Sequence, residues 1–149
     1  MPEDRSHGDK PSVGARESGL VGDETPFDLV GGAARVRAIV ETFYDAMSER
    51  ETVLSRLHSC DAEGRVDRAS RDRFALFLIG WLGGPDDYVE VHGHPRLRRR
   101  HAHLVVDESM RDAWLRSMQI ALDTHEVKGD VRTFLDARFA EVADFLRNA

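Results

Sequence analysis

The stretch that decides how this chain folds runs from Gly83 to Met118 and reads GGPDDYVEVHGHPRLRRRHAHLVVDESMRDAWLRSM. Two glycines and a proline open it, and this combination ends a helix because neither residue type extends one well. No helical periodicity follows until about Val106. Asp107 then has the character of a helix N-cap, because its carboxylate can accept a hydrogen bond from a backbone N–H of the first turn. The stretch therefore predicts the end of one helix, a long irregular connection and the start of another helix.

On both sides of this stretch, apolar residues recur every three or four positions, as they do on one face of a helix. The four predicted helical faces are Val36, Ile39, Val40, Phe43, Tyr44 and Met47; Phe74, Phe77, Leu78 and Trp81; Met110, Trp114, Met118, Ala121 and Leu122; and Val131, Phe134, Leu135, Val142, Phe145 and Leu146. Leu76 and Ile79 make the second helix, from about Val66 to Trp81, apolar on more than one side, so we expect it to be well buried. Because strand patterns are nearly absent, the sequence predicts an all-α fold with four main helices and short helical pieces between them.

The first 25 residues differ in composition from the rest of the chain. They contain glycines among charged residues and serines and show no sustained apolar periodicity, which is typical of segments that cannot form a core. We therefore expect a flexible tail over residues 1–25 and one domain over residues 26–149. The single cysteine, Cys60, excludes an internal disulfide and is consistent with a reducing cytoplasm.

The charge and the apolar content argue against two classes of partner. A formal net charge of -6 does not suit a dedicated nucleic-acid binder, because such proteins bind phosphates through clustered positive charge. The exception is the basic run Arg96–Arg100, which contains four arginines. No apolar run approaches the ~20 residues that a membrane span requires, and the N-terminal residues do not resemble a secretory signal. We expect neither nucleic acid nor a membrane as a partner.

Four of the seven histidines lie close together, at His92, His94, His101 and His103. Two His-x-His pairs suggest a zinc site, although structural zinc sites use four ligands at short spacings and catalytic sites often add a carboxylate. Most of these histidines, including His92 and His103, also fit an exposed polar loop. A third interpretation makes His101 an axial ligand of a haem iron, with one imidazole nitrogen on the metal and the other donating to a nearby acceptor. On these residues alone the alternatives stay open.

Further motifs accompany His101 in a fixed order. They are Val30-Gly31-Gly32, Phe43-Tyr44, Gly83-Gly84-Pro85, Tyr88, the run from Gly93 to His101, Asp112-Ala113-Trp114-Leu115 and Met118. Their order and spacing closely resemble the group II truncated haemoglobins, small bacterial haemoglobin-like proteins, from about Pro26 to Asn148. The resemblance implies a truncated globin fold, in which a two-over-two helical sandwich encloses haem b.

The resemblance also implies roles for three residues around the iron. His101 is the implied proximal ligand, and Tyr44 and Trp114 are expected to point into the distal pocket. A phenol can donate or accept a hydrogen bond, whereas an indole N–H can only donate. A donor in this position stabilises the negative charge that develops on an oxygen ligand.

The remaining implied site residues surround the haem. The expected pocket lining is Phe74, Phe77, Leu78 and Tyr88. Ser70 takes the place where larger globins usually carry a distal histidine. Arg98 and Arg100 are candidates to bind a haem propionate, because a guanidinium can bind a carboxylate bidentately and both residues lie just before the implied iron ligand.

His58 is the main departure from the family pattern. It stands at the end of the run Leu54–His58, where members usually carry Tyr or Phe beside the ligand. We expect a neutral His58 to donate a hydrogen bond to the ligand rather than to coordinate the iron, because coordination requires an approach to ~2 Å. The connection from Ser59 to Arg68 is also longer than in the family and includes Gly64 and several charges.

Together these features predict a haem protein that reversibly binds or transports oxygen, or binds carbon monoxide or nitric oxide. Turnover of nitric oxide or peroxide, as a dioxygenase or a peroxidase-like enzyme, is a further expectation and needs a reductant that the sequence does not identify. The alternative from another class is a histidine-rich metal-binding or interaction module built on helices, without haem. The sequence leaves open whether the protein is a monomer or a homodimer.

Overall fold

The computed structural model describes residues 24–149, so the tail predicted for residues 1–25 lies outside the described part except for its last two residues. The helices are α1 (Pro26–Val30), α2 (Ala33–Arg50), α3 (Thr52–Ser55), α4 (Arg68–Trp81), α5 (Asp87–His92), α6 (Leu97–His101), α7 (Glu108–Thr124) and α8 (Gly129–Phe145). Within residues 24–149 no strand forms, and the β-type pairing consists of an isolated bridge between Cys60 and Val66. The predicted all-α class is therefore confirmed. No helix in this range is both long enough and apolar enough to cross a membrane.

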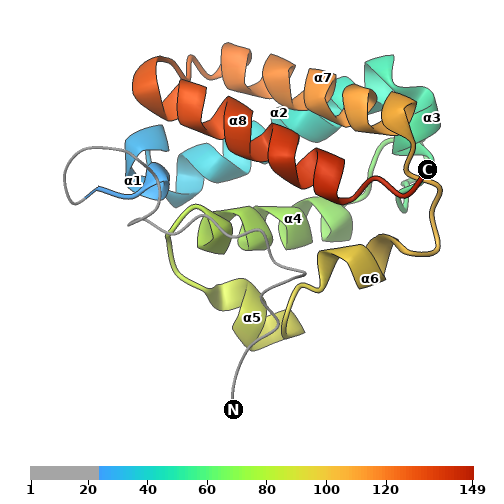
Figure 1. Ribbon diagram of the computed structural model, residues 1–149, viewed down its shortest axis with the longest axis horizontal. Coiled ribbons are helices and arrows are strands. Elements are labelled where there is room, and N and C mark those ends of the chain that lie inside the picture. Colours follow the sequence, from blue (N-terminus) through green and yellow to red (C-terminus); the bar gives the residue numbers. More distant parts are fainter. Residues whose placement is uncertain (1–23) are drawn as a thin grey trace.

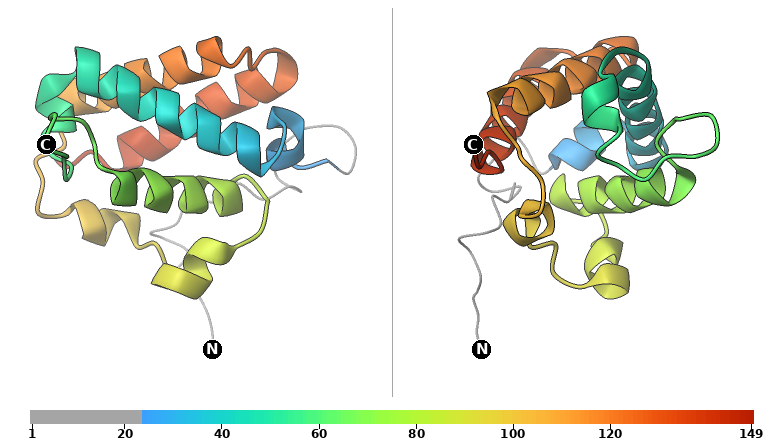
Figure 2. Two further views of the ribbon diagram at one scale, coloured as in Figure 1. Left: turned by 180° about the vertical axis from the view of Figure 1, so that it is seen from behind. Right: turned by 90° about the vertical axis from the view of Figure 1, so that its right-hand side faces the viewer.

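The long helices α2, α4, α7 and α8 form the body of the molecule in layers (Figure 1). α2 packs against both α7 and α4, and α8 lies alongside α7. The short helices α5 and α6 lie beyond α4, on the side of the molecule away from α7 (Figure 2). α3 follows directly from α2 and contacts α7. Side chains from both layers and from α6 consequently face one region in the middle of the molecule.

The apolar face predicted for the first long helix is buried in α2. Its members are Val36, Ile39, Val40, Phe43, Tyr44 and Met47, each of them buried. α2 begins directly after Gly31 and Gly32, which have φ values of 113° and 87°. Residues with a side chain disfavour these values, whereas glycine adopts them readily. Gly31 ends α1 and Gly32 precedes α2, so the two glycines set the angle between these helices.

The glycines after Trp81 allow α1 to pack on the end of α4. A Cβ atom at Gly84 would lie 2.7 Å from the ring of Phe27, which is closer than two carbon atoms approach. In addition, the backbone N–H of Phe27 donates to the carbonyl oxygen of Leu82 at 2.9 Å. The helix stop predicted at this point is therefore confirmed, and it also serves as a docking surface for α1.

The connection between Gly83 and Val106 is more structured than its sequence indicates. It contains the two short helices α5 and α6, and α6 begins after Arg96, whose φ is 47°. Helices of five or six residues are too short to show apolar periodicity, and they depend on tertiary contacts for stability. The N-cap predicted at Asp107 is confirmed, because its side chain accepts a hydrogen bond from the Met110 N–H at 2.9 Å.

A cluster of ion pairs holds the long connection between α3 and α4 against α2. The buried guanidinium of Arg71 lies 2.9 Å from the carboxylates of Glu41 and Asp45, and its Nε donates to the Val66 carbonyl at 2.8 Å. The guanidiniums of Arg68 and Arg71 lower the pKa of Glu41, although partial burial opposes them. The start of α4 is thereby fixed relative to α2 in spite of the length of the connection.

Candidate functional site

A cavity of about 470 Å³ lies in the middle of the molecule and brings together most of the predicted site residues. Those that line it are Tyr44, His58, Ser70, Phe74, Phe77, Leu78, Tyr88, Arg100, His101 and Trp114. Arg98 is not among the lining residues. Side chains from distant parts of the sequence therefore meet at one cavity, as the motif pattern predicts.

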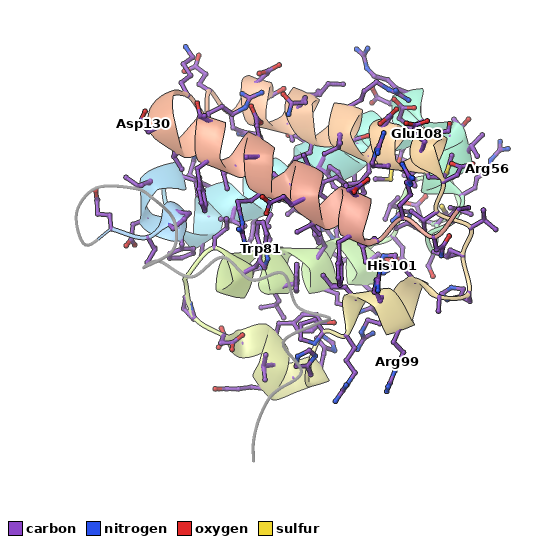
Figure 3. The ribbon with its side chains drawn as sticks, viewed as in Figure 1. Arg56, Trp81, Arg99, His101, Glu108 and Asp130 are labelled. Atoms are coloured by element: carbon purple, nitrogen blue, oxygen red, sulfur yellow. The ribbon has the colours of Figure 1, made fainter. Side chains whose placement is uncertain are left out.

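His101 reaches the cavity from the last position of α6 (Figure 3). Its Nδ1 lies 2.7 Å from the carbonyl oxygen of Leu97, one helical turn earlier. A carbonyl oxygen only accepts, so the ring proton sits on Nδ1 and Nε2 keeps a lone pair. In Figure 3 the His101 ring points toward the body of the molecule, whereas Arg99 on the same helix points away from it. His101 thus has the orientation and the tautomer of a metal-ligating histidine.

Stacked aromatic rings form one wall of the cavity. Phe74 and Phe77 on α4 are stacked with ring centroids 6.3 Å apart, and Tyr88 on α5 meets Phe77 edge-on at 5.7 Å. Phe139 on α8 packs against Trp114 at 5.7 Å and also lines the cavity. The result is an apolar wall of flat side chains that suits a flat ring system.

Tyr44 and Trp114 bring polar groups to this apolar wall. The ring of Tyr44 is buried, and burial raises the pKa of its phenol, so the hydroxyl stays protonated and able to donate. Trp114 packs edge-on against Phe43 at 5.1 Å. Among residues 24–149, neither polar group makes a hydrogen bond that would occupy its proton, so both donors are free to serve a ligand.

His58 also lines the cavity, beside Tyr44, with ring centroids 5.6 Å apart. Its Nδ1 lies 3.2 Å from the carbonyl oxygen of Leu54. Burial lowers the pKa of His58, and hydrogen bonding to the backbone at Leu54 and Ser55 opposes this shift in part. The ring is therefore neutral at pH 7, with its proton on Nδ1. This geometry differs from the expectation that neutral His58 donates to the ligand, because its donor is directed to the backbone.

Ser70 lines the cavity at the start of α4. Its backbone N–H donates to the Asp67 carboxylate at 2.8 Å, and its side chain also bonds this carboxylate, so that the two bonds lower the pKa of Asp67. The Ser70 hydroxyl therefore contributes to the helix cap and is a weaker candidate for a ligand contact than Trp114.

The arginines near the cavity separate into two groups. Arg98 turns toward the end of α8, where its guanidinium lies 4.6 Å from the centre of the Phe145 ring and Nε donates to the Phe145 carbonyl at 3.2 Å. Arg100 lines the cavity, as does Arg73 on α4. Arg73 was not predicted as a site residue, although its spacing of three residues from Ser70 and four from Phe77 places it on the same helical face.

The cavity suits a large, flat, apolar group that carries a metal ion and acidic substituents. His101 supplies one imidazole lone pair, the aromatic wall supplies apolar surface, and Arg73 and Arg100 supply positive charge for carboxylates. Within residues 24–149, no three His, Cys, Asp or Glu side chains gather as they would around a zinc ion, which disfavours the zinc alternative. These features define a haem protein built on a helical sandwich.

The relatives of the chain identify its family. The bacterial-like globin family matches residues 25–148. The group 2 truncated hemoglobin YjbI of Bacillus subtilis (strain 168) is 31% identical over 123 residues, which are 83% of this chain and 88% of that protein. The chain is therefore a bacterial-like globin of the group II truncated haemoglobins. Membership in this family implies a haem cofactor and haem-based ligand binding.

Solved structures agree with this assignment and confirm the truncated globin fold. The cold-adapted truncated hemoglobin of the Antarctic marine bacterium Pseudoalteromonas haloplanktis TAC125 has a TM-score of 0.77 and 36% identity, over 85% of this chain and 99% of that one. The group II truncated hemoglobin of Bacillus anthracis has a TM-score of 0.78 and 33% identity, over 87% of this chain and 95% of that one. The two-over-two arrangement predicted from the sequence is thus shared with proteins of known structure.

Proposed function

We propose that this protein holds haem b through His101 and reversibly binds oxygen, carbon monoxide or nitric oxide in the cavity. The observation that carries the proposal is the His101 ring, whose Nδ1 is bound to the Leu97 carbonyl at 2.7 Å and whose Nε2 lone pair is left for a metal. The haem would supply an iron atom with an open coordination position for the ligand. In support, the truncated haemoglobin of Bacillus subtilis, with a TM-score of 0.75 and 30% identity, is oxygen-avid.

The residues of the cavity would divide the work of holding the cofactor and the ligand. The aromatic wall would pack against the haem ring, and Arg73 and Arg100 would pair with its carboxylates. The Trp114 N–H and the Tyr44 O–H would donate to a ligand that accumulates negative charge. Such bonds are stronger in an apolar pocket than in water.

Turnover of nitric oxide or peroxide is the second candidate function. His58 favours it, because a partly buried imidazole at the cavity can accept a proton as well as release one. This chemistry requires a reductant from a separate partner. The reducing cytoplasm is the setting that we propose, supported by the presence of a single cysteine.

The test of the main proposal is the absorption spectrum of the purified protein supplied with haem. A strong Soret band at one haem per chain, with reversible shifts on addition of oxygen and carbon monoxide to the reduced protein, is the expected result. Extraction of the cofactor into alkaline pyridine checks whether it is haem b. A colourless protein that contains stoichiometric zinc would contradict the proposal.

A further inference from the structure

The backbone of its own helical turn fixes the hydrogen-bonding character of His58. Nδ1 faces the Leu54 carbonyl at 3.2 Å, and this oxygen can only accept, so the ring proton occupies Nδ1. Nε2 then carries a lone pair. Because burial lowers the pKa of the ring, the neutral form with this tautomer prevails at neutral and alkaline pH.

Two hydrogen-bond donors border the same part of the cavity. The ring centroids of Tyr44 and His58 are 5.6 Å apart. The ring centroid of Phe74 lies 5.8 Å from that of Tyr44 and 6.3 Å from that of Trp114. The rings of Tyr44, His58 and Trp114 therefore border one part of the cavity together with Phe74. A ligand in this region meets donors and an acceptor together.

We propose that His58 is a hydrogen-bond acceptor for the ligand, and that the cavity therefore favours small ligands that carry a proton of their own. Hydroperoxide and hydrosulfide belong to this class, because each can accept a bond from Trp114 and donate one to His58. Azide and carbon monoxide have no proton to donate. The inference rests on the proposed haem function and names the class of ligand that the same site prefers.

The physical reason is the cost of an unmatched acceptor in an apolar cavity. An aprotic anion places a second acceptor against the His58 lone pair, which is repulsive and leaves Nε2 without a partner. A protic ligand satisfies Nε2 and leaves its own lone pairs for the Trp114 N–H. The preference between the two classes thus depends on one nitrogen atom.

The test compares two small monoanions, hydrosulfide and azide, on the ferric haem-loaded protein at pH 8. Optical titrations give the equilibrium dissociation constants of both anions for the natural protein and for His58→Phe, which keeps an aromatic ring and removes the acceptor. We expect azide to bind more tightly to the variant and hydrosulfide to bind more weakly. The ratio of the two affinities should change by about tenfold, the upper range for one hydrogen bond.

The sign of the azide effect separates the roles that His58 can have. If His58 donates, azide binds more weakly to His58→Phe. If His58 coordinates the iron, both anions bind more tightly to the variant, and the natural protein shows a low-spin spectrum that the variant loses. Either result would overturn the inference, as would unchanged constants for both anions.

Two further variants keep the test decisive. His92→Phe is the matched control, because His92 lies at the end of α5 and does not line the cavity, so both constants should stay unchanged. His58→Leu repeats the measurement if His58→Phe does not fold. Anion binding of any strength leaves the proposed haem function intact, whereas the absence of a Soret band would remove that function itself.

Discussion

At the scale of single residues, the ring nitrogen that carries the proton determines which hydrogen bonds or metal bonds each cavity histidine can make. In both His101 and His58, Nδ1 is bound to the carbonyl oxygen four residues earlier, at 2.7 Å and 3.2 Å. The two side chains therefore present Nε2 lone pairs to the cavity, although they come from different elements. Fixing the ring through the backbone also reduces the rotational freedom that a ligand would otherwise have to restrict.

His101 should be the protein ligand that is essential for holding haem. His101→Gly removes the imidazole and is expected to lower the haem content of the purified protein severely. Added imidazole should restore a Soret band, because it can occupy the space left by the side chain. The measurement is the ratio of Soret to protein absorbance, with His92→Gly as the control, which should keep its haem because His92 does not line the cavity. Normal haem content in His101→Gly would place the ligand elsewhere, and His94→Gly would be tested next.

Trp114 should slow the dissociation of oxygen. Trp114→Phe keeps an aromatic ring and deletes the N–H donor, whose net contribution is ~0.5–1.5 kcal/mol for a neutral hydrogen bond. Oxygen should therefore leave the reduced protein several-fold to about tenfold faster, as measured by stopped-flow absorbance. Carbon monoxide, a poorer hydrogen-bond acceptor, is the control ligand and should respond less. An unchanged oxygen rate would assign the contact to Tyr44.

Protonation of His58 should reverse its role at acidic pH. Because burial lowers the pKa of His58 from its ordinary value of 6.5, Nε2 gains a proton only below that pH, and it then becomes a donor. Oxygen dissociation is therefore expected to slow as the pH falls below 6.5 and to be nearly constant from pH 7 to 8. A pH series of stopped-flow rates on the natural protein and on His58→Phe checks this, since the variant should show no such slowing. A slowing centred above pH 7 would contradict the lowered pKa.

At the scale of elements, ion pairs rather than apolar packing hold the connection between α3 and α4 against α2. The connection that precedes α4 is rich in exposed residues, so apolar contacts alone cannot position it. Arg71, which is buried, bridges Glu41 and Asp45 on α2. A buried guanidinium needs both carboxylates, because an unpaired buried charge is strongly destabilising.

The ion pairs of Glu41 with Arg68 and Arg71 should make the stability of the protein depend on pH. The arginines hold the pKa of Glu41 below its ordinary value of 4.5, so its contribution is present above that pH and is lost as the pH falls through the lowered value. Since Glu41 is partly exposed to solvent, Glu41→Gln should cost only about 0.5–1 kcal/mol at pH 7, and the difference should shrink as the pH falls below 4.5 through the lowered pKa. Urea unfolding at several pH values measures it. Glu49→Gln is the control, because Glu49 lies 3.6 Å from Arg65 and is more exposed; an equal loss in both variants would contradict the specific role of Glu41.

The long helices could be predicted from the sequence, whereas the short ones could not. In α2 and α7, apolar residues repeat over four turns, and the repeat alone indicates the buried face. α5 and α6 have five or six residues and owe their form to contacts with residues distant in the sequence, such as that of Arg98 with Phe145. The order of the motifs around His101 nevertheless predicted the family, and ten of the eleven predicted site residues line the cavity.

The sequence did not predict the directions in which several side chains of the site point. Arg98 and Arg100 are two residues apart, and only the backbone of α6 shows that Arg100 lines the cavity while Arg98 turns to α8. The acceptor role of His58 depends on the carbonyl of Leu54, which no residue pattern reveals. Arg73 could have been found from its helical spacing to Phe77.

At the scale of the whole molecule, the cavity lies beside the apolar core and shares Tyr44, Leu78 and Trp81 with it. Its walls come from both helical layers and from α6, so a bound haem would contact all of them at once. A ligand that binds only the folded state stabilises that state by RT ln(1 + [L]/Kd), which is about 2.7 kcal/mol when the free ligand concentration is 100 times Kd. The haem is thus expected to act as a large part of the core.

This view predicts that the loss of haem affects α6 before it affects the long helices. α6 has five residues and lacks a side-chain N-cap, and a helix of this length is not stable by itself. Its described attachments to the rest of the molecule include Leu97, which packs against the core, and Arg98, which lies on Phe145. A haem bound to His101 would connect α6 to the opposite walls of the cavity.

Hydrogen exchange of the haem-loaded and haem-free protein tests this coupling. The amides to follow are those of Arg100 and Leu104, which donate to the Arg96 and His101 carbonyls at 3.0 Å each. We expect both to exchange about 100-fold faster without haem, the factor that corresponds to saturation at 100 times Kd. Amides of the central turns of α2 should stay protected, because α2 packs against both α4 and α7 through fully buried residues such as Phe43. Equal protection of α6 in the two forms would show that the haem does not hold this helix, and a matching loss of protection in α2 would show that the whole fold, rather than α6, depends on the cofactor.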